Sequence, residues 1–226
     1  MAHTYEVEIK SLLGDKANAD ALRTRLKERF SELVEKGKHA HLNHYFVAPT
    51  DLSLLQQSIA PYIAEDKHAD LARILSEGKN HSIRTRDADG KVLFIVKASI
   101  GDDTSANGVS RIEFESPVVL SIEALDQILL DAGLSYQAKW SREREDYEVE
   151  GMNITIDKNA GYGYLAEFEK ILTDESDVPA AREELARCMA ELGVTELPQD
   201  RLERMFAHYN AHWNDYYGTD NIFVIE

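Results

Sequence analysis

Alternating charges mark the first extended segment of the chain, Glu6-Val7-Glu8-Ile9-Lys10. Alternate side chains of a strand share a face, so Glu6, Glu8 and Lys10 point one way and the apolar pair points the other way. Two carboxylates beside an ammonium group can hold a divalent cation together with an anion, because hard cations such as Mg²⁺ share carboxylate oxygens with substrate phosphates. The segment alone also fits an ordinary amphipathic edge strand with a solvated face.

Charged residues at alternate positions recur in the later segments that are typical of strands. A solvated outer face would look similar, but the mixture of signs favours faces that bind both metal and polyphosphate. Carboxylates would hold the cation, and arginine and lysine would hold phosphate oxygens. The charged positions are Arg84, Arg86, Lys97, Arg111, Glu113, Glu115, Arg142, Arg144, Asp157, Glu167 and Glu169.

The elements that must position these residues alternate between short strands and helices. The period-two pattern predicts strands at 5–10, 41–47, 82–86, 92–99, 109–119, 138–149, 153–158 and 163–171. Helical periodicity and caps predict helices at 17–36, at 51–77 in two pieces broken at Pro61, and at 121–132, 178–192 and 200–213.

Two turns complete this outline: a tight hairpin at Asp89-Gly90 and a polar loop from Gly101 to Gly108. The helices carry apolar stripes that need an apolar surface to cover. We therefore predict an α+β fold, an eight-stranded antiparallel β-barrel tunnel with a charged interior and helices packed outside.

Composition narrows the class of protein. The chain has 226 residues and a net charge of −16, which argues against nucleic acid or an anionic membrane as a partner. No apolar run reaches the roughly 18 residues of a membrane span, and the first residues lack a leader pattern, so a cytoplasmic location is expected. The single Cys188 excludes an internal disulfide.

Taken in order, these motifs resemble the CYTH domain, the superfamily of triphosphate tunnel metalloenzymes. Glu6–Lys10 resembles the family's ExExK opening. Segments similar to its RxR, single-lysine, RxExE, KxRxxY and closing Asp-to-ExE strands follow at 83–86, 94–97, 111–115, 142–147 and 154–169. We expect one domain, 1–226, with its core at 5–172, a helical insertion at 51–80 and a C-terminal helical extension at 176–226.

The resemblance implies a tunnel that binds a small triphosphate substrate and Mg²⁺ or Mn²⁺. The implied metal carboxylates are Glu6, Glu8, Glu113, Glu115, Asp157, Glu167 and Glu169. The implied phosphate-binding residues are Lys10, Arg84, Arg86, Lys97, Arg111, Arg142 and Arg144. The implied catalytic candidates are Lys10, Arg142 and Tyr45.

One departure from the family pattern concerns the catalytic candidates. Arg142 stands where the family has a lysine, and an arginine stays protonated and cannot act as a general base. Lys139 lies nearby, but its register places it on the other face of the strand.

Three functions remain open. The leading hypothesis is metal-dependent hydrolysis of tripolyphosphate, thiamine triphosphate or ATP. A class IV adenylate cyclase is the alternative, because 5–8 and 93–97 resemble bacterial cyclase segments. A non-catalytic polyphosphate-binding module is the third, and Arg142 is its best support. The aromatic residues near the C-terminus leave a homodimer open.

Overall fold

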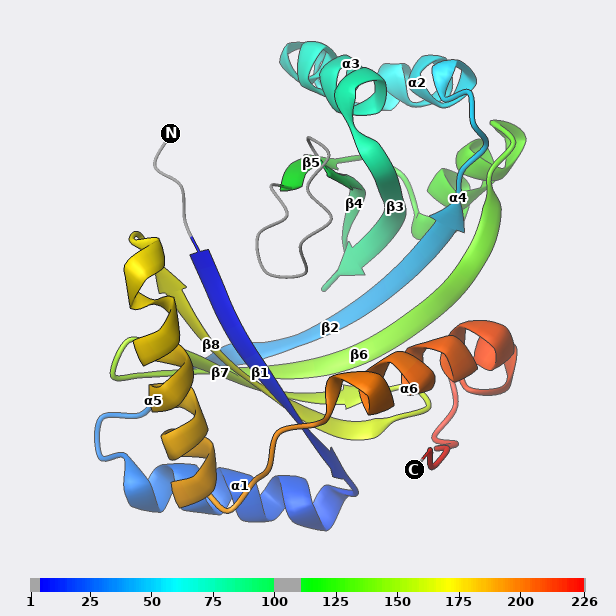
Figure 1. Cartoon of the computed structure of the whole chain (residues 1–226). Helices are drawn as coiled ribbons and strands as arrows, with labels where there is room; N and C mark the ends of the chain where they lie inside the picture. Colours follow the sequence, from blue (N-terminus) through cyan, green and yellow to red (C-terminus); the bar gives the residue numbers. More distant parts are fainter. Residues whose placement is uncertain (1–4, 100–110, 226) are drawn as a thin grey trace. The chain divides into compact units, whose positions relative to one another are not determined.

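The computed structural model describes residues 5–99 and 111–225. Eight strands form one sheet in the order β1-β8-β7-β6-β2-β3-β4-β5, and helices pack on it, so the predicted α+β class with an eight-stranded antiparallel sheet is confirmed (Figure 1). The strands are β1 Tyr5–Gly14, β2 Val34–Val47, β3 Lys79–Ala88, β4 Lys91–Ser99, β5 Arg111–Pro117, β6 Ser135–Val149, β7 Met152–Asn159 and β8 Gly163–Leu172.

The described part of the chain also contains six α-helices and four short 3-10 turns, of which α5, α6, η3 and η4 follow the last strand. The helices are α1 Lys16–Arg29, α2 Ser53–Ile59, α3 His68–Glu77, α4 Ile122–Asp131, α5 Val178–Glu191 and α6 Gln199–His212. The 3-10 turns are η1 Ala60–Tyr62, η2 Glu65–Lys67, η3 Glu175–Asp177 and η4 Trp213–Asp215. No described helix is long and apolar enough to cross a membrane.

The chain groups into two compact units. Unit 1 comprises 1–40 and 141–226, and unit 2 comprises 41–140. Each unit has its own hydrophobic core on the face of its strands that the helices cover. The expectation of a single domain stays a prediction.

In unit 1, α1 and α5 cover the apolar faces of β1 and β8 (Figure 1). The core joins Ile9 and Phe168 of these strands to Leu22 and Leu26 of α1, all at most 2% exposed. The carboxylate of Asp15 begins α1 by accepting a hydrogen bond from the Asn18 backbone N–H at 2.8 Å.

The prediction of a helix at 17–36 is wrong beyond residue 29. Phe30 has extended backbone angles, φ −120° and ψ 103°, and β2 begins at Val34, well before the predicted start of that strand at 41. Val34 and Gly37 are weak helix formers, and pairing in the sheet decides the conformation of this segment.

In unit 2, α3 packs on β4 and β5, α4 packs on β3, and α2 packs against α3 and α4 in the same core. Phe46, Ile83 and Phe94 lie in this core and are at most 2% exposed. The chain between α2 and α3 breaks in the turn that contains Pro61, as predicted. The predicted hairpin is also confirmed, because Asp89 and Gly90 both have positive φ, 52° and 85°, between β3 and β4. The predicted loop at 101–108 lies outside the described residues.

Candidate functional site

The charged face of unit 1 is built around Arg144. Register places Arg144 of β6 directly opposite Asp157 of β7. Arg144 Nε and one terminal nitrogen donate to the two Asp157 oxygens at 2.7 and 2.6 Å, and the same terminal nitrogen donates to Glu167 Oε2 on β8 at 2.6 Å. Asp157 is only 1% exposed, so this pairing stabilises a buried charge.

Two further cations join the same face. A terminal nitrogen of Arg142 lies 3.3 Å from Asp157 Oδ2, and Lys10 Nζ lies 3.3 Å from Glu167 Oε1 and also pairs with Glu8. Burial raises the pKa of Glu167, but Lys10, Arg144 and Arg142 outweigh it and hold that pKa below its usual value. The face therefore presents three cationic side chains, and they favour the ionised form of Glu167.

One end of this face carries carboxylates that face each other. Register puts Glu8 of β1 directly opposite Glu169 of β8, and Glu6 lies two residues before Glu8 on the same face. Asn153 Nδ2 donates to Glu169 Oε1 at 3.4 Å. Directly opposed like charges repel, and a hard divalent cation would offset this repulsion. The donor chemistry thus fits Mg²⁺ or Mn²⁺, although no described cluster of three acidic, imidazole or thiol groups is already arranged as a metal shell.

The charged face of unit 2 brings together residues from β2, β3, β4 and β5. A terminal nitrogen of Arg84 donates to the Tyr45 hydroxyl at 2.8 Å, and the other lies 3.8 Å from Glu113 Oε1. Lys97 Nζ lies 2.9 Å from Glu113 Oε2. The Nε atom of Arg84 is buried without a hydrogen-bond partner among the described residues, so this guanidinium keeps a donor for a further acceptor.

The remaining predicted residues of unit 2 are less closely grouped. Arg86 Nε donates to Asn43 Oδ1 at 2.7 Å, and Glu115 stands opposite Ile95 in the ladder. Arg111 begins β5, with its backbone paired to Ser99. Asn43 was not predicted as a site residue. Asn43 and Tyr45 are two positions apart on one strand and therefore share a face, which could have indicated its place beside Tyr45.

Behind the unit 2 sheet, a buried carboxylate fixes α4. Asp126 of α4 accepts hydrogen bonds from Thr85 and Tyr136 at 2.6 and 2.7 Å and lies 2.6 Å from His44 Nδ1. Lys139 Nζ lies 3.7 Å from the same carboxylate. Lys139 is therefore on the helix-covered face, which agrees with its predicted register and removes it as a replacement for the family lysine.

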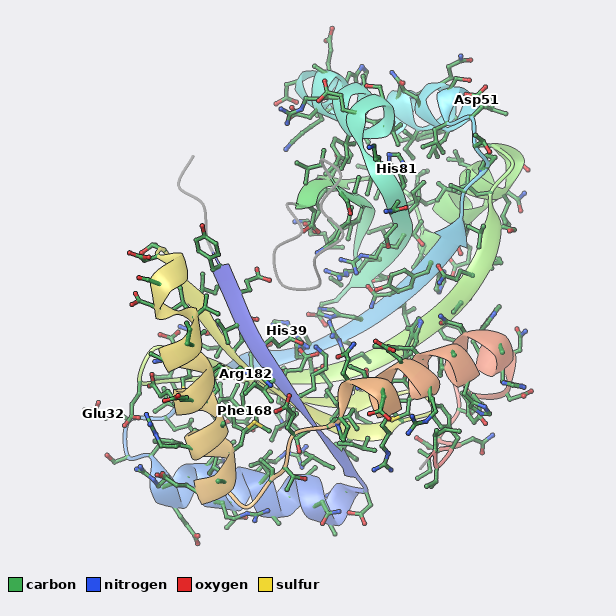
Figure 2. All side chains as sticks on the ribbon, in the orientation of Figure 1. Glu32, His39, Asp51, His81, Phe168 and Arg182 are labelled. Carbon is green, nitrogen blue, oxygen red and sulfur yellow. The ribbon has the colours of Figure 1, made fainter. Side chains whose placement is uncertain are left out.

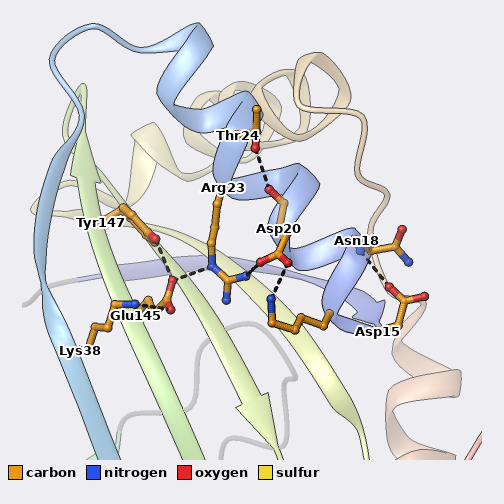
Figure 3. A network of polar contacts seen from close by, with 9 residues as sticks. Asp15, Asn18, Asp20, Arg23, Thr24, Lys38, Glu145 and Tyr147 are labelled. Atoms are coloured by element: carbon orange, nitrogen blue, oxygen red, sulfur yellow. Dashed lines mark hydrogen bonds and ion pairs between the residues drawn. The ribbon is translucent and has the colours of Figure 1, made fainter.

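An equivalent network ties α1 to β6 in unit 1 (Figure 3). Glu145 Oε2 accepts from Arg23 Nε and the Tyr147 hydroxyl, both at 2.8 Å, and Glu145 Oε1 accepts from Lys38 at 3.0 Å. Burial raises the pKa of Glu145, but these three donors lower it to about 2. Tyr147, the last residue of the predicted KxRxxY motif, thus lies on the helix-covered face.

One family model and several solved structures are similar to this chain. The CYTH domain family model matches residues 4–201. The structure of the PH1819 protein from Pyrococcus horikoshii is similar with a TM-score of 0.56 and 23% identity, over 90% of this chain and 99% of that one. A candidate adenylate cyclase from Vibrio parahaemolyticus gives 0.56 and 17%, over 90% and 98%.

A third solved structure, a conserved hypothetical protein from Pyrococcus furiosus, has a TM-score of 0.54 and 16% identity, over 84% of this chain and 91% of that one. At these identities the structural likeness shows the fold alone. No curated protein matches the sequence significantly.

Proposed function

This chain belongs to the CYTH domain family, and from that membership we propose that it is a divalent-metal-dependent hydrolase of triphosphate compounds. The observation that carries the proposal is the charged face of unit 1. There, Arg144 and Lys10 both contact the carboxylate of Glu167, and Glu8 directly opposes Glu169. This combination of anionic and cationic groups suits a polyphosphate bound together with a metal ion.

Each group on this face has a separate role in the proposal. Glu6, Glu8 and Glu169 would hold the cation, which when bound neutralises charge on phosphate oxygens. Arg144 binds phosphate as a guanidinium already oriented by Asp157 and Glu167, so little reorganisation is needed when negative charge develops.

On unit 2, we assign phosphate binding to Arg84 and Lys97. Tyr45 orients Arg84 through the hydrogen bond at 2.8 Å, and the partly exposed Lys97 retains an ammonium group that can exchange Glu113 for a phosphate oxygen. Tripolyphosphate, thiamine triphosphate and ATP all carry three linked phosphates whose oxygens can bind to such cationic side chains. The cytoplasmic location remains a prediction.

The test is Glu8→Gln with tripolyphosphate, Mg²⁺ and Mn²⁺. We expect metal-dependent phosphate release to fall at least about a hundredfold, because even residues that only support metal ligands cost 10–100-fold. Glu183→Gln on the exposed side of α5 is the matched control and should leave the rate unchanged. Full activity of Glu8→Gln, with an unaltered fold by circular dichroism, would contradict the proposal.

The second candidate is an adenylate cyclase, favoured by the resemblance of 5–8 and 93–97 to bacterial cyclase segments. It uses the same binding groups, but the ribose 3′-hydroxyl attacks the α-phosphorus and pyrophosphate leaves. Incubation with ATP separates the two activities, because a cyclase yields cyclic AMP and pyrophosphate and a hydrolase yields phosphate. Tight binding of tripolyphosphate without turnover would instead indicate a binding module.

A further inference from the structure

The proposed hydrolase lacks an obvious general base, because Arg142 stands where the family has a lysine. A base must accept the proton of the attacking water, and a guanidinium cannot do so. Imidazole is the side chain best suited to this task near neutral pH. His39 of β2 supplies an imidazole beside the charged face of unit 1.

One row of side chains crosses the charged face of unit 1. Register aligns Lys10, Glu167, Thr155 and Asp146 directly opposite one another on β1, β8, β7 and β6. At the end of this row, His39 Nε2 of β2 lies 3.6 Å from Asp146 Oδ2. The imidazole thus extends the row that contains the lysine and the carboxylate beside Arg144.

The surroundings of His39, labelled in Figure 2, suit a reactive imidazole. Its side chain is 43% exposed, so water reaches it. A Cβ at Gly37 would lie 3.2 Å from His39 Nε2, so the glycine leaves room for the ring. Asp146 faces the ring from β6, with Arg144 and Glu148 at the adjacent positions of that face, and Glu148 pairs with Lys36 of β2 at 2.5 Å.

Two neighbours of His39, Asp146 and Thr155, also favour a reactive site here. Burial raises the pKa of Asp146, although Arg144 and His39 both lower it, so this carboxylate is only partly solvated. The hydroxyl of Thr155, next in the row, is buried and has no hydrogen-bond partner among the residues described. A buried hydroxyl of this kind calls for a bound water or a ligand oxygen.

We propose that His39 is the general base of this chain and that Asp146 is its positioning residue. The inference rests on the proposed hydrolase function. Asp146 Oδ2 lies 3.6 Å from His39 Nε2 and stabilises the imidazolium that forms when the ring takes up a proton. The oxygen of water attacks the terminal phosphorus, its proton moves to the imidazole of His39, and the bond from phosphorus to the bridging oxygen breaks, leaving the electron pair on the diphosphate.

The experiment compares His39→Gln with the wild-type protein on tripolyphosphate and Mg²⁺ across pH. Loss of a general base should lower kcat by about a hundredfold, with KM changed less than about threefold, and should remove the acidic limb of the kcat profile. Free imidazole should restore part of the activity of His39→Ala. His212→Gln, on the exposed side of α6, is the control and should match the wild type.

Two variants test the positioning. Asp146→Asn should lower kcat about tenfold, a smaller effect than loss of the base itself. Gly37→Ala should also lower kcat with KM preserved, because the new methyl group meets the imidazole. Phosphate release that depends on Glu8 but is unchanged in His39→Gln would overturn this inference alone. A wild-type protein that releases no phosphate with any metal would overturn both this inference and the proposed function.

Discussion

Arg144 is fixed by carboxylates on two neighbouring strands, and this fixes its chemical role. Three hydrogen bonds of 2.6–2.7 Å leave the guanidinium with a single orientation. Asp157 and Glu167 raise the pKa of Arg144 against the effect of burial, so its charge is permanent. The sequence predicted Asp157 and Glu167 as metal ligands and Arg144 as a phosphate-binding residue. In the structure, both carboxylates accept hydrogen bonds from Arg144.

Replacing Arg144 by lysine tests this arrangement. A single ammonium group cannot make the paired bonds to Asp157 and also reach Glu167 in the same geometry. We expect the free energy of unfolding to fall by about 1.5–3 kcal/mol, the scale of one hydrogen bond to a charged group, measured by urea denaturation. Arg182→Lys in the exposed pair with Glu196 is the control and should change it by less than about 0.5 kcal/mol. If Arg144→Lys and Arg182→Lys lowered the free energy of unfolding equally, the paired bonds of Arg144 would not stabilise the fold as argued.

At the scale of elements, a polar anchor behind each sheet face holds a helix in place. Glu145 ties β6 to α1, and Asp126 holds α4 against β2 and β3. The strands themselves were predictable, because alternation along one segment reveals both faces. These anchors were not, because their partners are far apart in sequence: Arg23 and Glu145 are 122 positions apart, and His44 and Asp126 are 82. The pairing of His39 with Asp146 escaped prediction for the same reason.

The Glu145 anchor predicts a defined pH dependence of stability. Its pKa is about 2 in the folded protein against an ordinary 4.5, so its contribution is complete above pH 4.5 and is lost as pH falls toward 2. The shift corresponds to at most about 3 kcal/mol. Glu145→Gln should therefore lower stability at pH 7, and the difference from wild type should shrink between pH 4.5 and 2.

Thermal unfolding across this pH range measures the effect. Glu191→Gln is the control, since Glu191 forms an exposed pair with Arg29 and should contribute less than about 1 kcal/mol. A difference between Glu145→Gln and wild type that stays constant from pH 7 to 2 would show that the charge of Glu145 does not stabilise α1 on β6.

At the scale of the whole molecule, the chain builds two hydrophobic cores from one sheet. β2 and β6 contribute residues to both units, and the remaining strands belong to one unit each. Composition and periodicity predicted the strands and the covering helices but not this division. The division depends on which helix covers which strands, and that is a matter of tertiary contact rather than local pattern.

Separate cores predict separate responses to a cavity. Phe168 lies in the core of unit 1 (Figure 2) and Ile83 in that of unit 2, and both are fully buried. Phe168→Ala should cost about 3–5 kcal/mol and Ile83→Ala about 2–5 kcal/mol. Hydrogen exchange followed by mass spectrometry should show faster exchange in β7 and β8 for the first variant and in β3 and β4 for the second. If either variant accelerates exchange equally in both sets of strands, the two cores unfold as one cooperative unit.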